Sequence, residues 1–309
     1  MINYYKNSET GRLYSTEKVS SGCWISVVNP TPQEIKILID DFGLDSGFVK
    51  SSLDEEESSR IEREDDQTLI IIDTPVSSMD DSETKIFYTM PIGIILTNEN
   101  VITISLHESQ LIDEAVRGTI RNLRPSFKTR FVLQLLLRIA ALFLYYLKQI
   151  DKISSVAEKQ LHNAMKNELL MQLLALEKSL VYFSTSLKAN EATIEKIFRG
   201  RVMKLYDEDQ DLLEDVLIEM KQAIEMSSIY SGILSSMTEG FSGVISNNLN
   251  IVMWRLTIVT IIMQIPNIIF AFYGINTVDL PLPYTWFPIV LAVVITAVAT
   301  VVLLKWKKK

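Results

Sequence analysis

Four polar side chains recur at helical spacing inside a segment that is otherwise apolar. The set, separated by 3, 4 and 3 residues, is Thr257, Thr260, Gln264 and Asn267. This spacing places hydroxyl and amide groups on one face of a helix. Such groups cost free energy in hydrocarbon unless they are paired, so the face should meet neighbouring helices or a water-filled cavity. Both alternatives stay open on periodicity alone, and simple helix–helix bonding would contribute about 0.6 to 2 kcal/mol per group.

If identical helices packed around one axis, this face would line a tube with rings of weak, neutral oxygen ligands. A strongly hydrated divalent cation suits such rings, because Mg²⁺ keeps several of its waters and a site can bond to its hydration shell. The membrane voltage is a sufficient energy source, since two charges at 100 mV gain about 4.6 kcal/mol. On the water-filled alternative, the pattern therefore suits a channel for divalent cations.

The elements that must position these residues are two membrane spans. Leu256–Tyr273 and Phe287–Leu304 are uncharged runs of 18 residues each, and helices of that length cross a hydrocarbon core of roughly 30 Å. The linker Gly274–Trp286 has no Lys or Arg, whereas four lysines follow the second span, at positions 305 and 307–309. The positive-inside rule then places both termini in the cytoplasm of a multi-pass protein of the cell membrane.

A long helix precedes the first span, with no proline between Asp207 and Pro266. Apolar or small residues recur in it at 3,4 spacing, which is typical of a helix that packs against copies of itself or its neighbours. They are Leu213, Val216, Met220, Ala223, Ser227, Tyr230, Leu234, Met237, Phe241 and Val244. Unbroken to Tyr273, this stalk would be about 100 Å long.

The N-terminal part reads as an α/β domain. Strands are expected at Cys23–Val28, Thr68–Asp73, Ile86–Leu96 and Val101–Ser105, and Thr31-Pro32 should cap a helix through Ile39. The acidic stretch Asp54–Asp66 is expected to be a solvated helix or loop. From about Ser109 the chain should be helical. Phe131–Leu147 resembles a third span, but Arg138 in its centre would cost roughly 2.5 to 3.5 kcal/mol in a bilayer, which favours a buried helix of the soluble part.

Composition excludes several other classes of protein. The net charge of −8 argues against nucleic acid as a partner. A single cysteine, Cys23, excludes a disulfide framework, and with two distant histidines a zinc cage within one chain is not expected. The N-terminal residues 1–10 lack the apolar core of a cleaved export signal. No arrangement of catalytic residues can be singled out, so we do not expect an enzyme.

The end of the first span carries a motif with a family resemblance. Tyr273–Asn276 reads YGIN, after a long stalk helix and before a short linker, a second span and the tail KWKKK. This arrangement resembles the CorA family of divalent cation transporters, whose motif here is Gly-Met-Asn. Residues 250–257, NIVMWRLT, are similar to the family's Asn-Glu-Val-Met-Lys-Val-Leu-Thr, and residues 180–190 also look like a stretch common in its members. The resemblance covers essentially the whole chain.

The resemblance implies a homopentamer shaped as a funnel and embedded in the lipid bilayer. Gly274 and Asn276 would form the selectivity filter that captures a hydrated cation. Asn250, Met253 and Leu256 match pore and gate positions, where the last two would make an apolar constriction that closes by dewetting. The remaining pore lining would be the polar stripe already described.

Asp215 falls where the family has a stalk carboxylate in an intersubunit metal site. Bound intracellular Mg²⁺ would hold the channel shut there. Its suggested partner from the globular domain is Asp80 or Asp81, and the alternative is that Asp215 is one more solvated acid.

The motif leaves more than one ion open. Ile275 replaces the family's methionine, and the Gly-Ile-Asn form is frequent in the zinc-transporting ZntB-type branch. We expect Mg²⁺ first, with Co²⁺ or Ni²⁺ also carried, a Zn²⁺ transporter as the alternative, and a non-conducting membrane-anchored sensor or scaffold as the second alternative.

The expected architecture is an α+β membrane protein divided into seven parts. They are an α/β domain (1–125), a helical bundle (126–206), a stalk helix (207–255), a first span (256–273), an outer loop with the motif (274–286), a second span (287–304) and a basic cytoplasmic tail (305–309).

Overall fold

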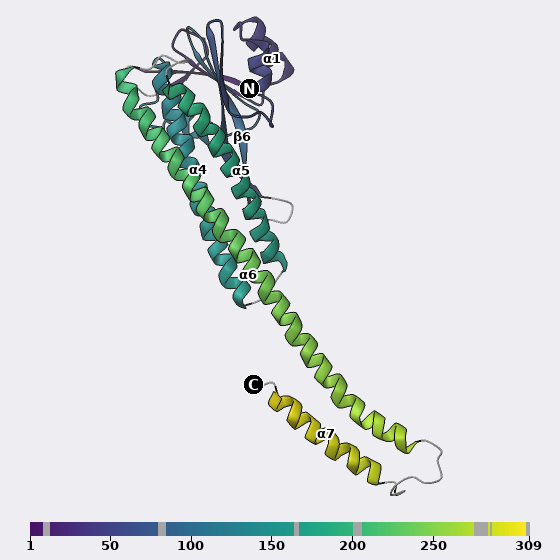
Figure 1. Cartoon of the computed structure of the whole chain (residues 1–309). Coiled ribbons are helices and arrows are strands. Elements are labelled where there is room, and N and C mark those ends of the chain that lie inside the picture. The colour runs from purple at the N-terminus through teal and green to yellow at the C-terminus, as the bar shows by residue number, and fades with distance from the viewer. Residues whose placement is uncertain are drawn as a thin grey trace. The chain divides into compact units, whose positions relative to one another are not determined.

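The computed structural model describes residues 1–8, 13–79, 85–163, 167–199, 206–274, 284 and 286–306. The chain divides into two compact units, Met1–Thr238 and Glu239–Lys309. One helix, α6 (Asp207–Tyr273), contributes residues to both units (Figure 1). Its 67 residues confirm the long unbroken helix that the sequence predicts.

The first unit is built on a seven-stranded sheet with the order β2-β1-β3-β7-β6-β5-β4. The strands are β1 (Ile2–Asn7), β2 (Leu13–Thr16), β3 (Trp24–Val28), β4 (Arg60–Glu64), β5 (Gln67–Met79), β6 (Lys85–Leu96) and β7 (Val101–Ser105). Among the strands that the structure describes, only β3 and β7 pair in parallel, with Trp24 opposite Val101, and the other neighbours are antiparallel.

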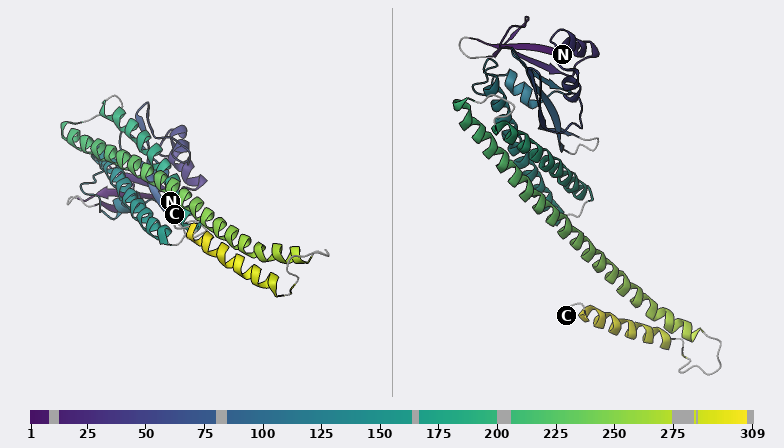
Figure 2. Two further views of the ribbon diagram at one scale, coloured as in Figure 1. Left: turned by 60° about the horizontal axis from the view of Figure 1, so that its bottom comes forward. Right: turned by 45° about the horizontal axis from the view of Figure 1, so that its top comes forward.

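Helices cover both faces of the sheet, which explains why successive residues of β3 and β7 are buried without alternation. On one face lie α1 (Pro32–Asp40) and α2 (Ser46–Ser51), and Ile25 packs in a common core with residues of both helices. On the other face lie α4 (Lys128–Asn163) and α5 (Asn167–Phe198), where the ring of Trp24 contacts Phe131 (Figure 2). α4 and α5 therefore pack on this face, against β4, β5 and β6.

The cap predicted at the start of α1 is confirmed. The Thr31 side chain accepts a hydrogen bond from the Glu34 backbone N–H, the Glu34 side chain closes the capping box, and Pro32 occupies the first turn. The prediction for the acidic stretch is wrong in part, because Arg60–Glu64 forms β4. This edge strand pairs with β5 on one side only, so its charged residues stay solvated. Strands β1 and β2 were not predicted.

α4 is long and apolar enough to span a membrane, yet two thirds of its most apolar window is buried inside the first unit. Arg138, in the middle of that window, donates hydrogen bonds to both carboxylate oxygens of Glu114 on α3 (Gln110–Val116). The bond from Arg138 lowers the pKa of Glu114. The arginine that argued against a third span is thus paired within the soluble unit.

A buried polar cluster fastens α5 to the middle of β5, the strand next to the edge of the sheet. The Asn190 side chain accepts from the Asp73 backbone N–H (3.0 Å) and donates to the Asp73 carbonyl (2.9 Å), replacing a strand neighbour. The Ser59 hydroxyl also donates to Asn190 Oδ1 (2.7 Å). Burial raises the pKa of Asp73, while a hydrogen bond from Ser186 opposes that rise.

The early part of α6 packs inside the first unit, alongside α4 and α5 (Figures 1 and 2). Of the residues predicted to form its seam, six are buried there: Leu213, Val216, Met220, Ala223, Ser227 and Leu234. The Ser227 hydroxyl donates to the Leu180 carbonyl of α5. The spacing allowed this face to pack against copies of the helix or against its neighbours. Over this stretch it packs against helices of its own chain.

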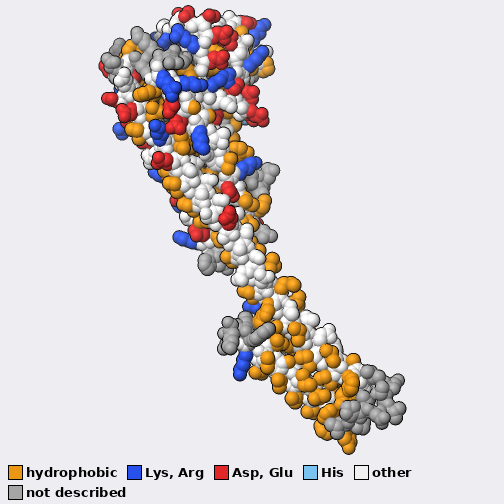
Figure 3. Space-filling view, in the orientation of Figure 1, with side chains coloured by type: hydrophobic (Ala, Val, Ile, Leu, Met, Phe, Trp, Pro, Cys, Tyr) orange, Lys and Arg blue, Asp and Glu red, His pale blue; other side chains and the backbone are white. Residues whose placement is uncertain are grey.

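The second unit is a pair of apolar helices. It consists of the last part of α6 and of α7 (Phe287–Trp306), which agrees with the two predicted spans to within two residues at the C-terminal end. Within the described residues, Glu208–Tyr273 also qualifies as a span by length and composition, and Phe287–Leu303 is a shorter apolar helix. Only 6% of the most apolar window of α6 is buried. Hydrophobic side chains dominate the visible surface of this unit (Figure 3).

Candidate pore-lining face of the first span

The polar stripe of α6 lies on exposed surface in the second unit. Thr257, Thr260, Gln264 and Asn267 are all exposed. The Thr257 hydroxyl donates to the Met253 carbonyl (2.8 Å), and the Thr260 hydroxyl donates to the Leu256 carbonyl (2.9 Å). The two amides form no hydrogen bond with any residue that the structure describes, so they remain available to a partner outside the single chain.

The second span packs against the opposite side of α6. Ile258 is 8% exposed, and the half-buried residues of α6 lie with it on one side: Ile251, Trp254, Ile262, Ile265, Pro266, Ile269 and Tyr273. At about 100° per residue, this side is roughly opposite to the polar stripe. The Tyr273 ring contacts the Phe287 ring of α7 at a centroid distance of 6.2 Å. Contact with α7 therefore does not account for the amide side chains of Gln264 and Asn267, which lie on the other side of the helix.

The face of α7 that is turned inward carries small residues. Ala292 is 3% exposed, and Thr296 and Ala299 follow it at helical spacing with intermediate exposure. Small residues at spacings of three and four let membrane helices pack side by side. Sequence reasoning missed this face, although the Ala-xxx-Thr-xx-Ala spacing was present as a signal.

The remaining pore residues predicted on α6 extend the same exposed side. Asn250, Met253 and Leu256 are exposed, and together with the stripe they follow one line along the helix. Gly274 ends the helix, where its N–H donates to the Phe270 carbonyl (2.9 Å). Its predicted filter partner, Asn276, lies outside the described residues.

The predicted regulatory carboxylates are only partly described. Asp215 is exposed on α6, and it forms no ion pair with any described residue. Asp80 and Asp81 lie outside the described residues. Within the described part of the chain, no group of three or more His, Cys, Asp or Glu side chains is arranged to hold a metal ion.

The fold and the stripe define a class: a membrane protein with a folded soluble unit and a helix whose polar face needs partners beyond its own chain. The chain belongs to the CorA-like Mg²⁺ transporter family, whose family model matches residues 20–309. The family is one of transporters, in line with the expectation that the chain is not an enzyme.

Individual relatives agree with this assignment. The cobalt/magnesium transport protein CorA of Methanocaldococcus jannaschii is 28% identical over 268 residues, covering 84% of this chain and 81% of that protein. The complete structure of the CorA magnesium transporter from the same organism has the same fold, with a TM-score of 0.80 at 24% identity over 100% of this chain and 98% of the other.

The zinc-transporter alternative has a weaker structural counterpart. The ZntB cytoplasmic domain from Vibrio parahaemolyticus matches with a TM-score of 0.62 at 13% identity, covering 79% of this chain and 98% of that domain. Since that likeness is to a cytoplasmic domain and shows the fold alone, it does not bear on which ion this chain carries.

Proposed function

We propose that this protein is a divalent cation transporter of the cell membrane that admits hydrated Mg²⁺, and also Co²⁺, through a pore built by identical copies. The observation that carries the proposal is the exposed polar face of α6, whose Gln264 and Asn267 amides α7 leaves uncovered. In hydrocarbon those amides require water or protein partners. Copies of α6 around one axis supply both.

The chemistry of this face suits a cation that keeps its water. Amide and hydroxyl oxygens are neutral ligands, and they can hold the hydration shell of Mg²⁺ without removing it. Neutral sites also bind weakly enough to release the ion, as conduction requires. The voltage supplies about 4.6 kcal/mol per ion at 100 mV, so passive influx needs no other energy source.

The proposed filter and gate lie along the same axis. Gly274 and Asn276 form the outer ring that captures the hydrated cation. Met253 and Leu256, both exposed on α6, narrow the pore with apolar side chains, and this constriction closes when it dewets. We place the assembly as a homopentamer in the lipid bilayer, with both termini in the cytoplasm.

The filter is tested by Asn276→Ala in the full-length protein reconstituted into vesicles. We expect Mg²⁺ influx to fall at least tenfold, because the ring loses its side-chain amides, while the pentamer mass in detergent is unchanged. Asn247→Ala is the matched control, since Asn247 is an exposed asparagine of α6 away from the stripe. Normal influx through Asn276→Ala pentamers would refute the filter.

The same assay decides the ion. Influx of Mg²⁺, Co²⁺, Ni²⁺ and Zn²⁺ is measured in parallel at equal driving force. Faster Zn²⁺ than Mg²⁺ influx would favour the ZntB-type alternative, and no influx of any of the four would favour a sensor or scaffold.

We further propose that Asp215 takes part in feedback by intracellular Mg²⁺. Its carboxylate is exposed on α6 and has no ion-pair partner among the described residues, so a cation and a neighbouring copy can reach it. Asp80 or Asp81 remains the suggested second ligand. Metal bound between copies would lock them together, and its loss would let repulsion between carboxylates open the pore.

The regulatory role is tested by Asp215→Ala, with the nearby exposed acid Glu214→Ala as control. We expect the Asp215 variant to conduct at internal Mg²⁺ concentrations that close the wild type, with a several-fold higher half-inhibitory concentration. An unchanged inhibition curve would make Asp215 an ordinary solvated acid.

A further inference from the structure

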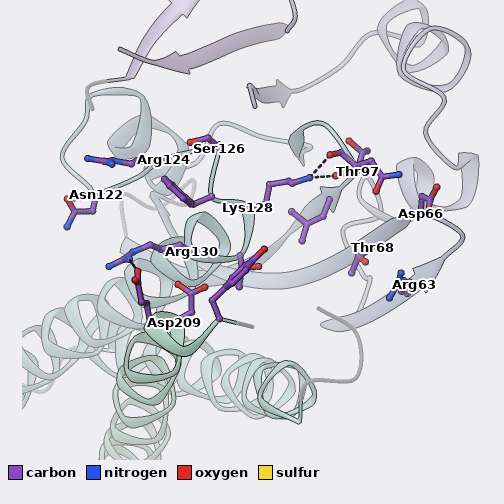
Figure 4. A pocket seen from close by; sticks show the side chains of 16 residues that line it. Arg63, Asp66, Thr68, Thr97, Asn122, Arg124, Ser126, Lys128, Arg130 and Asp209 are labelled. Carbon is purple, nitrogen blue, oxygen red and sulfur yellow. Dashed lines mark hydrogen bonds and ion pairs between the residues drawn. The ribbon is translucent and has the colours of Figure 1, made fainter. Parts of the chain in front are cut away.

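A pocket of about 1180 Å³ opens in the first unit, far along the chain from the pore-lining residues. Its walls come from the turn between β4 and β5, the turn between β6 and β7, the loop before α4 and the start of α6 (Figure 4). Small-molecule sites commonly measure roughly 300 to 1,000 Å³, so this pocket has room for a ligand of substantial size.

Lys and Arg side chains are concentrated at this pocket, although the protein as a whole is acidic. Residues 117–130 contain five Lys or Arg, and no Asp or Glu occurs between Glu114 and Asp151, although the net charge of the chain is −8. From this segment Arg124, Lys128 and Arg130 line the pocket, and Arg63 lines it from β4. Asp66, Glu208 and Asp209 are the acids among the lining residues.

The cations are not fully neutralised by these acids. Arg124 and Arg63 form no ion pair with any residue that the structure describes. Arg130 makes a loose pair with Glu208, at 3.6 Å between Nη1 and Oε2, and both side chains are exposed. Pairs of this kind contribute little, so an incoming anion can compete for Arg130. Arg124 and Arg130 reach toward the same end of the pocket as Asn122 (Figure 4).

Lys128 adds positive charge to the pocket, and hydrogen bonds hold its ammonium group in place. Its ammonium donates to the carbonyls of Thr97 (2.8 Å) and Asn98 (2.7 Å), and burial lowers its pKa. Lys128 and Arg130 also stand in the first turn of α4, which contains no acidic residue. Cations at a helix N-terminus oppose the helix dipole, and a bound anion offsets that repulsion.

A buried carboxylate faces the same space. Asp209 is only 4% exposed, and its side chain forms no hydrogen bond or ion pair with any described residue. It lines the pocket and points into it (Figure 4). A buried carboxylate without a partner is costly, and it would repel a bare anion. An anion that brings a divalent cation with it satisfies both the guanidinium groups and this carboxylate.

Two aromatic rings complete the lining. Phe127, which is 58% exposed, and Tyr206 stand beside the cations. Exposed rings next to Arg and Lys provide stacking surfaces for a planar base. The pocket thus combines groups for a phosphate chain, for a metal ion and for an aromatic ring.

We propose that this pocket binds a polyphosphate anion together with its divalent cation, with Arg124 and Arg130 on the phosphates and Asp209 on the metal. A nucleoside triphosphate fits the whole pocket, and an inorganic polyphosphate fits its charged part. The site is independent of the pore and adds a ligand that the transport proposal does not require.

The test measures binding of radiolabelled ATP to the full-length protein in detergent, with and without Mg²⁺, and with tripolyphosphate as competitor. We expect saturable binding that tightens several-fold with Mg²⁺ and weakens as salt rises. Arg124→Gln combined with Arg130→Gln should weaken binding at least tenfold, because charge-assisted bonds to phosphate are lost. Lys188→Gln, an exposed cation of α5 outside the pocket, should leave binding unchanged.

Asp209→Asn separates the metal from the phosphate contribution. This variant should bind metal-free ATP at least as well as the wild type, yet gain nothing from Mg²⁺. Equal competition by tripolyphosphate would identify the phosphate chain as the ligand, and weaker competition would identify the nucleotide; both support the site. Absence of saturable binding to the wild type at millimolar ATP and tripolyphosphate, or wild-type affinity in the double variant, would overturn the proposal.

Discussion

Replacing Gln264 and Asn267 together by leucine is expected to reduce Mg²⁺ influx into vesicles at least a hundredfold. Leucine is close in size to both residues, so the helix and its contact with α7 should persist, while the exposed face of α6 becomes apolar over the turn that holds both positions. Water leaves a narrow apolar pore, and a hydrated cation cannot follow without losing its shell. Influx is measured with a Mg²⁺-sensitive dye inside the vesicles under an imposed voltage.

Two comparisons make this result specific. Val259→Ile alters an exposed residue of the same helix that is neither three nor four positions from any member of the stripe, and it should leave influx unchanged. Exchanging the two amides, Gln264→Asn with Asn267→Gln, keeps hydrogen-bonding groups on the face and should retain measurable influx. Wild-type influx through the double leucine variant would mean that the amides contact protein instead of the ion path, and the pore would have to lie elsewhere.

Asn190→Ala is expected to lower the free energy of unfolding of the first unit by about 3 kcal/mol. This is the largest effect that we foresee for a residue outside the proposed pore. The Asn190 amide makes three hydrogen bonds, two of them to the backbone of Asp73 in the middle of β5. Alanine would leave a buried N–H and a buried carbonyl without partners, each costing about 1 to 3 kcal/mol. Part of that cost is recovered if water enters the space.

Hydrogen–deuterium exchange in the full-length protein measures this effect locally. We expect amides of β5 to exchange about a hundredfold faster in the variant, because 1.4 kcal/mol corresponds to tenfold. Lys188→Ala, on the exposed side of the same helix, should change exchange by less than about twofold. Unaltered protection of β5 in Asn190→Ala would show that packing, not this amide, holds α5 on the sheet.

Much of the fold was predictable because its signals are local. The spans are continuous apolar runs, the stalk is a periodic pattern without proline, and Thr31-Pro32 marks a helix start by its own chemistry. The exposed polar side of α6 was predictable for the same reason, since spacing alone determines which residues share a helix face. Its occupation by water around an axis remains a prediction that a single chain does not test.

What sequence reasoning missed depends on contacts between distant segments. β4 has the sequence RIERE, whose charges predict a solvated helix or loop, and only pairing with β5 makes it a strand. Asn190 and Asp73 are 117 positions apart, so their bond is invisible to any local pattern. The pocket before α4 likewise draws its walls from four segments. Asp80, Asp81 and Asn276 lie outside the described residues, so their roles stay proposals.

The two threonine hydroxyls of the stripe differ from its amides in one respect that matters for charge. Each hydroxyl donates its only proton to a carbonyl of its own helix, that of Met253 for Thr257 and that of Leu256 for Thr260. What remains outward is a pair of electron lone pairs, which accept hydrogen bonds but give none. Waters around a metal ion turn their hydrogens outward, whereas waters around chloride turn their oxygens outward. In the proposed pore, these two hydroxyls would therefore discriminate against anions by orientation alone, with no formal charge in the membrane.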